Sequence, residues 1–122
     1  LAVEADVGDR LAADRVTAAA VQRFGGFDTW VNNAGVGIFG KLDEVSDEDS
    51  RKLFDTNFWG SVYGSLAAVR HLRGKGGALV NIGSVASDIP FPMQGMYCAT
   101  KHALKGFTDS LREELIHEGA PV

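Results

Sequence analysis

The chain has 122 residues and a formal net charge of −4, with 45% apolar and 23% charged residues. This is the composition of one ordinary globular domain, and it excludes disordered, collagen-like and low-complexity chains. The acidic balance argues against nucleic acid as a partner, because a binding face for nucleic acid needs clustered Lys and Arg. The single cysteine, Cys98, excludes a scaffold stapled by internal disulfides.

The sequence contains no predicted membrane or export segment. No apolar run approaches the roughly 18–20 residues that a membrane-spanning helix needs. Residues 1–6 lack the basic start and the cleavage site of a signal peptide. We therefore expect a cytoplasmic protein with no membrane partner. The chain does not start with Met, which is compatible with processing or with sequence in front of Leu1.

The first third of the chain alternates strand-like and helix-like segments. Residues 1–6 are predicted as a short strand. Asp9 is placed to cap a helix over residues 10–24, whose apolar residues recur at helical spacing. Two glycines, 25 and 26, end this helix, because glycine accepts the left-handed conformation beyond a helix C-terminus. Residues 27–32 are predicted as a second strand.

The rest of the chain continues the alternation. Ser46, with Asp49 three residues later, resembles a capping box at the start of a helix over residues 47–73. Residues 78–82 are a nearly continuous apolar run, which is typical of a strand buried on both faces. A loop from 84 to 95 leads to a last helix over residues 96–117. This order of strands and helices predicts an α/β domain with a parallel sheet and flanking helices.

Polar residues follow the predicted strands. Ligands of such sheets bind at the carboxyl ends of the strands. Asp6, the run from Asn32 to Gly35, and Ser84 each stand at such an end. The small residues Asn33-Ala34-Gly35 either let a ligand approach the backbone or form a plain turn. Ser84 either binds a substrate oxygen or is an ordinary turn serine.

Tyr97 and Lys101 stand four residues apart in the last predicted helix. That spacing places them on one face, with Cβ atoms about 5–6 Å apart. A cation held near a phenol stabilises the phenolate, so such a tyrosine can exchange a proton with an alcohol or carbonyl. The pair also occurs by chance on many helices. Asn57, in the middle of a helix where Asn is unfavourable, is either functional or a satisfied core asparagine.

Taken together, these pieces resemble the short-chain dehydrogenase/reductase family of the classical type, over essentially the whole chain. The matching pieces are Asp6-Val7, Asn32-Asn33-Ala34-Gly35, Asn57, Asn81-Ile82-Gly83-Ser84 and Tyr97-Cys98-Ala99-Thr100-Lys101. The order of the pieces and the thirteen-residue interval from Ser84 to Tyr97 also fit. The resemblance implies a Rossmann-like fold and hydride transfer between NAD or NADP and a small carbonyl/alcohol pair.

The resemblance also implies four catalytic residues. Tyr97 would be the general acid/base, and Lys101 would promote its ionisation and hold the nicotinamide ribose. Ser84 would orient the substrate oxygen. Asn57 would hold a water that links Lys101 to solvent.

On the cofactor side, the resemblance implies contacts from both earlier strand ends. Asp6 and Val7 would border the adenine ring, and Asn33, Ala34 and Gly35 would line the adenosine half. Tyr97 and Lys101 would also touch the cofactor. Nothing in the sequence distinguishes NAD from NADP, and no cluster of His, Cys, Asp or Glu has the spacing of a metal site.

Two elements of the family are missing from the sequence. No T-G-x-x-x-G-x-G loop precedes Asp6, and no further strand or substrate-covering segment follows Val122. We therefore expect residues 1–122 to be a partial NAD(P)-binding domain, truncated at both ends, from the middle of a longer enzyme. The strand at 1–6 would have no neighbour, and the sheet would reduce to two strands. Two strands rarely suffice for stability, so these residues alone should be marginally stable and inactive.

Other interpretations stay open. A dinucleotide-binding fragment or regulator without catalysis fits the missing glycine-rich loop, and an epimerase or dehydratase could use the same scaffold. The resemblance implies a homodimer or homotetramer built on the two long helices. Apolar residues in the loop after Ser84 indicate an apolar substrate: Ile89, Phe91 and Met93.

Overall fold

The computed structural model describes all 122 residues, and from residue 10 onward its helices and strands follow the predicted α/β order. The strands β1 (Thr29–Asn32) and β2 (Ala78–Asn81) pair in parallel and form a two-stranded sheet. The helices are α1 (Arg10–Phe24), α2 (Asp47–Phe54), α3 (Gly60–Leu72) and α4 (Gly95–His117). None of these helices is both long and apolar enough to cross a bilayer.

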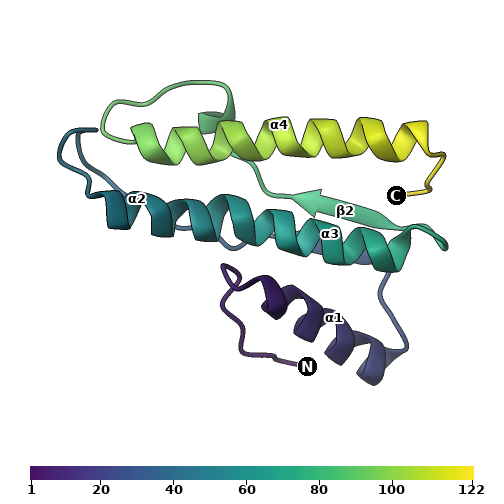
Figure 1. Cartoon of the computed structure of the whole chain (residues 1–122). Coiled ribbons are helices and arrows are strands. Elements are labelled where there is room, and N and C mark those ends of the chain that lie inside the picture. The colour runs from purple at the N-terminus through teal and green to yellow at the C-terminus, as the bar shows by residue number, and fades with distance from the viewer.

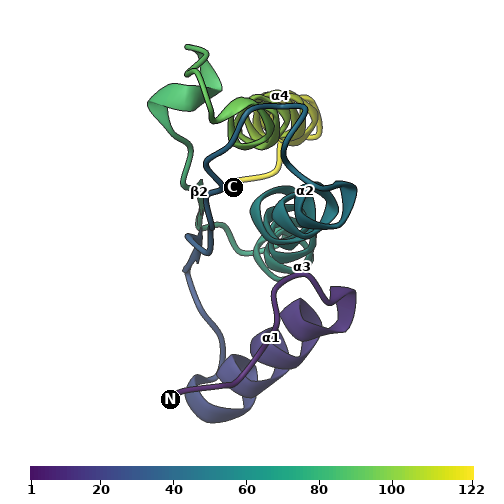
Figure 2. The ribbon, with the colours of Figure 1, turned by 90° about the vertical axis from the view of Figure 1, so that its left-hand side faces the viewer.

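The helices all cover the same face of the sheet. Helices α1, α3 and α4 lie side by side, with the two strands behind them (Figures 1 and 2). The prediction that residues 78–82 are buried on both faces is therefore wrong. Val80 is 39% exposed and Val31 is 53% exposed, because no helix of the chain covers the opposite face of the strands.

Residues 1–6 do not form the predicted strand. A strand needs a neighbour that accepts and donates its ladder hydrogen bonds, and no other strand of the chain lies beside this segment. The expectation that the sheet reduces to the two later strands is confirmed.

The ends of the first helix follow the sequence signals. The Asp9 carboxylate accepts a hydrogen bond from the Leu11 N–H at 3.0 Å. This bond, and a second one from Arg15, hold the pKa of Asp9 below its usual value. The helix stops at Gly25, which has a φ of 80°. Only glycine adopts this left-handed conformation without strain.

The predicted helix over residues 47–73 is continuous but not uniform. Ser46 caps α2, since its Oγ accepts from the Asp49 N–H at 3.0 Å. Between α2 and α3 the chain makes one π-helical turn, η1 (Asp55–Trp59), with Asn57 at its centre. Such turns insert an extra residue into an α-helix and are frequent at functional sites.

A chain of side-chain hydrogen bonds ties the sheet to its helices. Asn32 Oδ1 accepts from Trp30 Nε1 at 2.8 Å, and Asn32 Nδ2 donates to Ser65 Oγ on α3 at 3.1 Å and to Asn81 Oδ1 on β2 at 2.8 Å. Asn81 Nδ2 then donates to Thr108 Oγ1 on α4 at 2.9 Å. The network fixes both strands against α3 and α4 and satisfies polar groups that would otherwise be costly to bury.

The Thr108→Val substitution should destabilise the protein by about 1–3 kcal/mol, because it leaves Asn81 Nδ2 without its acceptor. Thr17 supplies a matched control, since its buried Oγ1 has no hydrogen-bond partner. The Thr17→Val substitution should be neutral or stabilising, because it removes an unsatisfied polar group. Urea unfolding of the two variants measures both effects. Equal changes in the free energy of unfolding would contradict this account of the network.

Candidate active site

A cleft of about 570 Å³ lies at the carboxyl ends of the two strands. Ser84 reaches it from the segment after β2, and Tyr97 and Lys101 reach it from the first turns of α4. Asn33 and Gly35, from the loop after β1, line it as well. The structure thus brings together residues that are up to 68 positions apart in the sequence, as the strand-end rule predicts.

Lys101 is buried at the edge of this cleft, with only 6% of its surface exposed. Its Nζ donates to the carbonyl oxygen of Ile82 at 2.9 Å. The Ile82 N–H bonds to the Asn32 carbonyl at 3.0 Å, so the residue that holds the ammonium also continues the pairing of β2 with β1. The same Nζ lies 5.8 Å from the centre of the Tyr97 ring. The arrangement places a fixed positive charge beside the phenol.

Ser84 caps a single turn of 3₁₀-helix, η2 (Val85–Ser87). Its Oγ accepts a hydrogen bond from the Ala86 N–H at 3.1 Å. A serine hydroxyl has one proton to donate and two lone pairs. With one lone pair bound to Ala86, the hydroxyl proton is available to an oxygen atom of a ligand in the cleft.

Asn57 does not line the cleft but lies fully buried under its floor. Its Oδ1 accepts from the Val36 N–H and its Nδ2 donates to the Val36 carbonyl, both at 2.8 Å. Gly35 forms the floor above it, and a Cβ there would lie 3.6 Å from Asn57 Oδ1 and 3.9 Å from Lys101 Nζ. The side chain of Asn57 therefore holds the loop after β1 in place.

Thr100 belongs to the same arrangement and was not singled out from the sequence. It is fully buried, donates to the Tyr97 carbonyl oxygen at 2.7 Å, and accepts from Asn57 Nδ2 at 3.2 Å. Its position in the sequence could have indicated this role, because a polar residue between Tyr97 and Lys101 falls on the buried side of the helix. Thr100 links the π-helical turn to the helix that carries Tyr97.

A second cavity of about 140 Å³ adjoins the cleft, between α1, α3 and the free edge of β1. Val7 and Ala34 line this cavity, and Asn33 lines both the cavity and the cleft. Asp6 lines neither. Its carboxylate is exposed and accepts from the Gly8 N–H at 2.9 Å. Of the predicted site residues, Asp6 and Asn57 are thus the two that stand outside both hollows.

The sequence profile of the family described as short chain dehydrogenase matches residues 1–122. An uncharacterized oxidoreductase of Bacillus subtilis, YxnA, is 50% identical over 122 residues, which cover 98% of this chain and 34% of YxnA. A short chain dehydrogenase/reductase of Burkholderia phymatum in complex with NAD superimposes with a TM-score of 0.97 at 32% identity, covering 100% of this chain and 44% of that one.

An alcohol dehydrogenase of Thermococcus sibiricus complexed with 5-hydroxy-NADP superimposes with a TM-score of 0.86 at 28% identity, covering 90% of this chain and 47% of that one. The chain therefore spans between a third and a half of the length of these relatives. Because the profile matches every residue, the chain belongs to the short-chain dehydrogenase family.

Proposed function

We propose that this chain forms the catalytic part of an NAD(P)-dependent oxidoreductase that interconverts a carbonyl and an alcohol, with Tyr97 as general acid/base. The observation that carries the proposal is the meeting of Ser84, Tyr97 and Lys101 in one cleft. A hydroxyl proton donor, a phenol and a buried ammonium are the groups that proton transfer to a carbonyl oxygen requires.

The hollows along the strand ends fit an elongated cofactor. The cleft and the apolar cavity share Asn33, so one ligand can extend from Tyr97 toward Val7. Gly35 lines the cleft without adding a side chain to it. Tyr97 and Lys101 would hold the nicotinamide end, and Asn33, Ala34 and Gly35 the adenosine half together with Val7. A bound nicotinamide supplies or accepts the hydride.

The chain's own residues then handle the proton. In reduction, the Tyr97 hydroxyl gives its proton to the substrate oxygen while the Ser84 hydroxyl donates a hydrogen bond to the same atom. The Lys101 ammonium stabilises the phenolate that remains, and its bond to Ile82 keeps it in place. In oxidation the phenolate takes the proton back.

The walls of the cleft favour an apolar substrate. Val36, Val85 and Phe91 line it beside the polar groups. For the assembly we propose a homodimer or homotetramer, because Trp59 on η1 and Leu66 on α3 are large apolar side chains that are 43% and 40% exposed.

The test is an assay of the full-length protein that carries these residues. A panel of small aldehydes and ketones is offered with NADH and with NADPH, and oxidation of the reduced nicotinamide is followed by its absorbance. We expect turnover with at least one apolar carbonyl compound. Nucleotide binding without turnover of any carbonyl or alcohol would favour a binding protein without catalysis, and substrate conversion without net oxidation of the nucleotide would favour an epimerase or dehydratase.

Residues 1–122 alone should be marginally stable and inactive, since we propose that they are the middle of a longer domain. One face of the sheet is open, and Val31 and Val80 are exposed on the strands. Two-stranded sheets are at best marginal in water. Thermal unfolding followed by circular dichroism should be broad and begin at low temperature. Cooperative unfolding together with nucleotide turnover by these residues alone would contradict the expectation.

A further inference from the structure

Ser84 is held by a shorter element of secondary structure than Tyr97 and Lys101. Tyr97 and Lys101 belong to the 23-residue helix α4, whose length makes their relative placement rigid. Ser84 stands at the start of η2, a turn of three residues. Short 3₁₀ turns have poor hydrogen-bond geometry and hold few bonds of their own. A further contact within the turn would fix the position of Ser84.

Ser87 supplies that contact. Its Oγ accepts a hydrogen bond from the Ser84 N–H at 3.2 Å. Ser84 Oγ in turn accepts from the Ala86 N–H, and the Ser84 carbonyl accepts from the Ser87 N–H at 2.9 Å. The two serines are thereby hydrogen-bonded to each other through both the backbone and the Ser87 side chain. Without Ser87 Oγ, the Ser84 N–H loses its partner within the chain.

Ser87 is buried next to Ser84 and lies outside the cleft. Only 7% of Ser87 is exposed, and a Cβ on Gly83 would lie 3.4 Å from its Oγ. Ser87 does not line the cleft that holds Tyr97 and Lys101. It lines a separate cavity of about 240 Å³ between η2 and α4, behind Ser84. Ser87 therefore touches Ser84 but not a ligand in the cleft.

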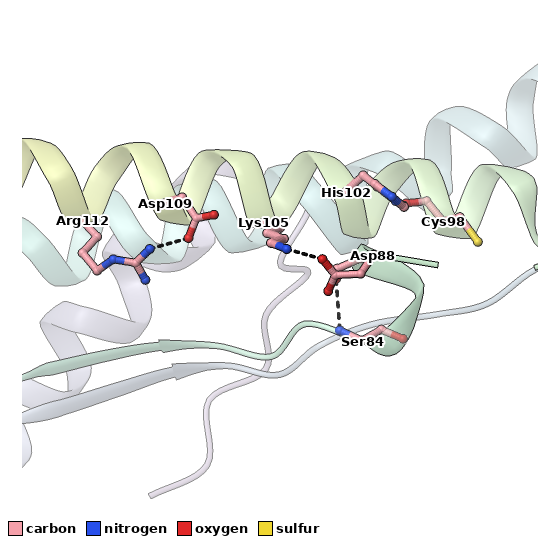
Figure 3. A network of polar contacts seen from close by, with 8 residues as sticks. Ser84, Asp88, Cys98, His102, Lys105, Asp109 and Arg112 are labelled. Carbon is pink, nitrogen blue, oxygen red and sulfur yellow. Dashed lines mark hydrogen bonds and ion pairs between the residues drawn. The ribbon is translucent and has the colours of Figure 1, made fainter. Parts of the chain in front are cut away.

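On the surface, Asp88, the residue after η2, is linked to α4. The Lys105 ammonium donates to the Asp88 carboxylate, as Figure 3 shows, and this hydrogen bond raises the pKa of Lys105. Both side chains are about half exposed. Ion pairs of this kind contribute little, because water replaces either partner readily. Asp88 is therefore a matched control for Ser87: it is the adjacent residue, but it lies outside the buried turn.

We propose that Ser87 is a positioning residue that holds the Ser84 hydroxyl toward the substrate oxygen. The inference rests on the proposed function, since it gives Ser84 a partner only if Ser84 contacts the substrate. Loss of the bond lets the Ser84 backbone relax, and its hydroxyl moves away from the line to the substrate oxygen. Misplacement by about 1 Å costs on the order of 10²-fold in rate, so a partial shift should cost about tenfold.

The experiment is a double-mutant cycle in the full-length protein, with kcat, nucleotide affinity and the pH profile as readouts. The Ser87→Ala substitution should lower kcat about tenfold and leave the nucleotide affinity and the pH profile unchanged. In a Ser84→Ala background the same substitution should have no further effect, because the group that Ser87 positions is gone. The Asp88→Asn control should change kcat by less than about twofold.

The outcomes separate the two proposals. A Ser84→Ala variant that keeps full activity overturns the proposed role of Ser84 itself. If Ser84→Ala is impaired, an unchanged kcat in Ser87→Ala overturns the positioning role, and so does an equal loss in both backgrounds. Should Ser87→Ala fail to fold, the Ser87→Cys variant serves instead. The cysteine side chain is close to serine in size but its sulfur is a weak acceptor. This variant should therefore show a smaller loss of kcat than Ser87→Ala, and again no further loss in the Ser84→Ala background.

Discussion

Replacement of Tyr97 by phenylalanine should lower kcat by about 10²–10⁴-fold, the range that a positioned general acid contributes. The ring stays in place beside Lys101, so the affinity for the nucleotide should change little. What disappears is the proton that the substrate oxygen needs during reduction. Steady-state kinetics measures the first effect, and quenching of protein fluorescence by the nucleotide measures the second.

The chain offers a matched control for this substitution. Its only other tyrosine, Tyr63 on α3, stacks on Trp59 with ring centres 5.9 Å apart and does not line the cleft. The Tyr63→Phe substitution should leave kcat unchanged. Full activity in the Tyr97→Phe variant would rule out the proposed acid/base role, whereas an equal loss in both variants would point to a general effect on the fold.

Substitution of Gly64 by alanine should destabilise the protein by about 2–5 kcal/mol, the largest effect on stability that we expect. Helix α3 approaches β1 at this glycine, and an added Cβ would overlap Asn32 Oδ1 and lie 3.0 Å from Trp30 Nε1. The methyl group therefore crowds the interface and also breaks the hydrogen bond between Trp30 and Asn32. Chemical denaturation gives the change in the free energy of unfolding.

Gly106 is the matched control for Gly64. It also lies inside a helix, α4, but a Cβ there would meet no atom within 4 Å. The Gly106→Ala substitution should stabilise the protein by about 0.5–1 kcal/mol, because alanine loses less backbone entropy in a helix. Opposite signs for the two substitutions would establish close packing as the cause. Destabilisation by both would contradict it.

Local patterns in the sequence were sufficient to predict most of the elements. Helix α1 begins and ends at the residues that Asp9 and Gly25 predict, and α4 matches its predicted range to within one residue. These signals depend on neighbours in sequence, such as a capping side chain or a glycine with positive φ. The meeting of Ser84, Tyr97 and Lys101 in one cleft was predictable for a similar reason, because Ser84 follows a strand end and the other two stand at helical spacing.

The failures concern contacts between distant segments. Residues 1–6 have the composition of a strand, but a strand exists only where a partner pairs with it. Residues 78–82 are apolar enough for burial on both faces, yet all four α-helices of the chain lie on the same face of the sheet. The role of Thr100 depends on Asn57, and that of Ser87 on the geometry of a three-residue turn. No spacing rule in a single sequence encodes such pairs.

The bond between Lys101 and the Ile82 carbonyl couples the cleft to the register of the sheet. The rise of a strand is about 3.3 Å per residue, and successive carbonyls point to opposite edges. A slip of β2 by one residue against β1 would therefore turn the Ile82 carbonyl away from Lys101 and leave a buried ammonium without its acceptor. A buried ammonium without an acceptor is costly, so the bond between Lys101 and Ile82 favours the native register of the two strands over a slipped one.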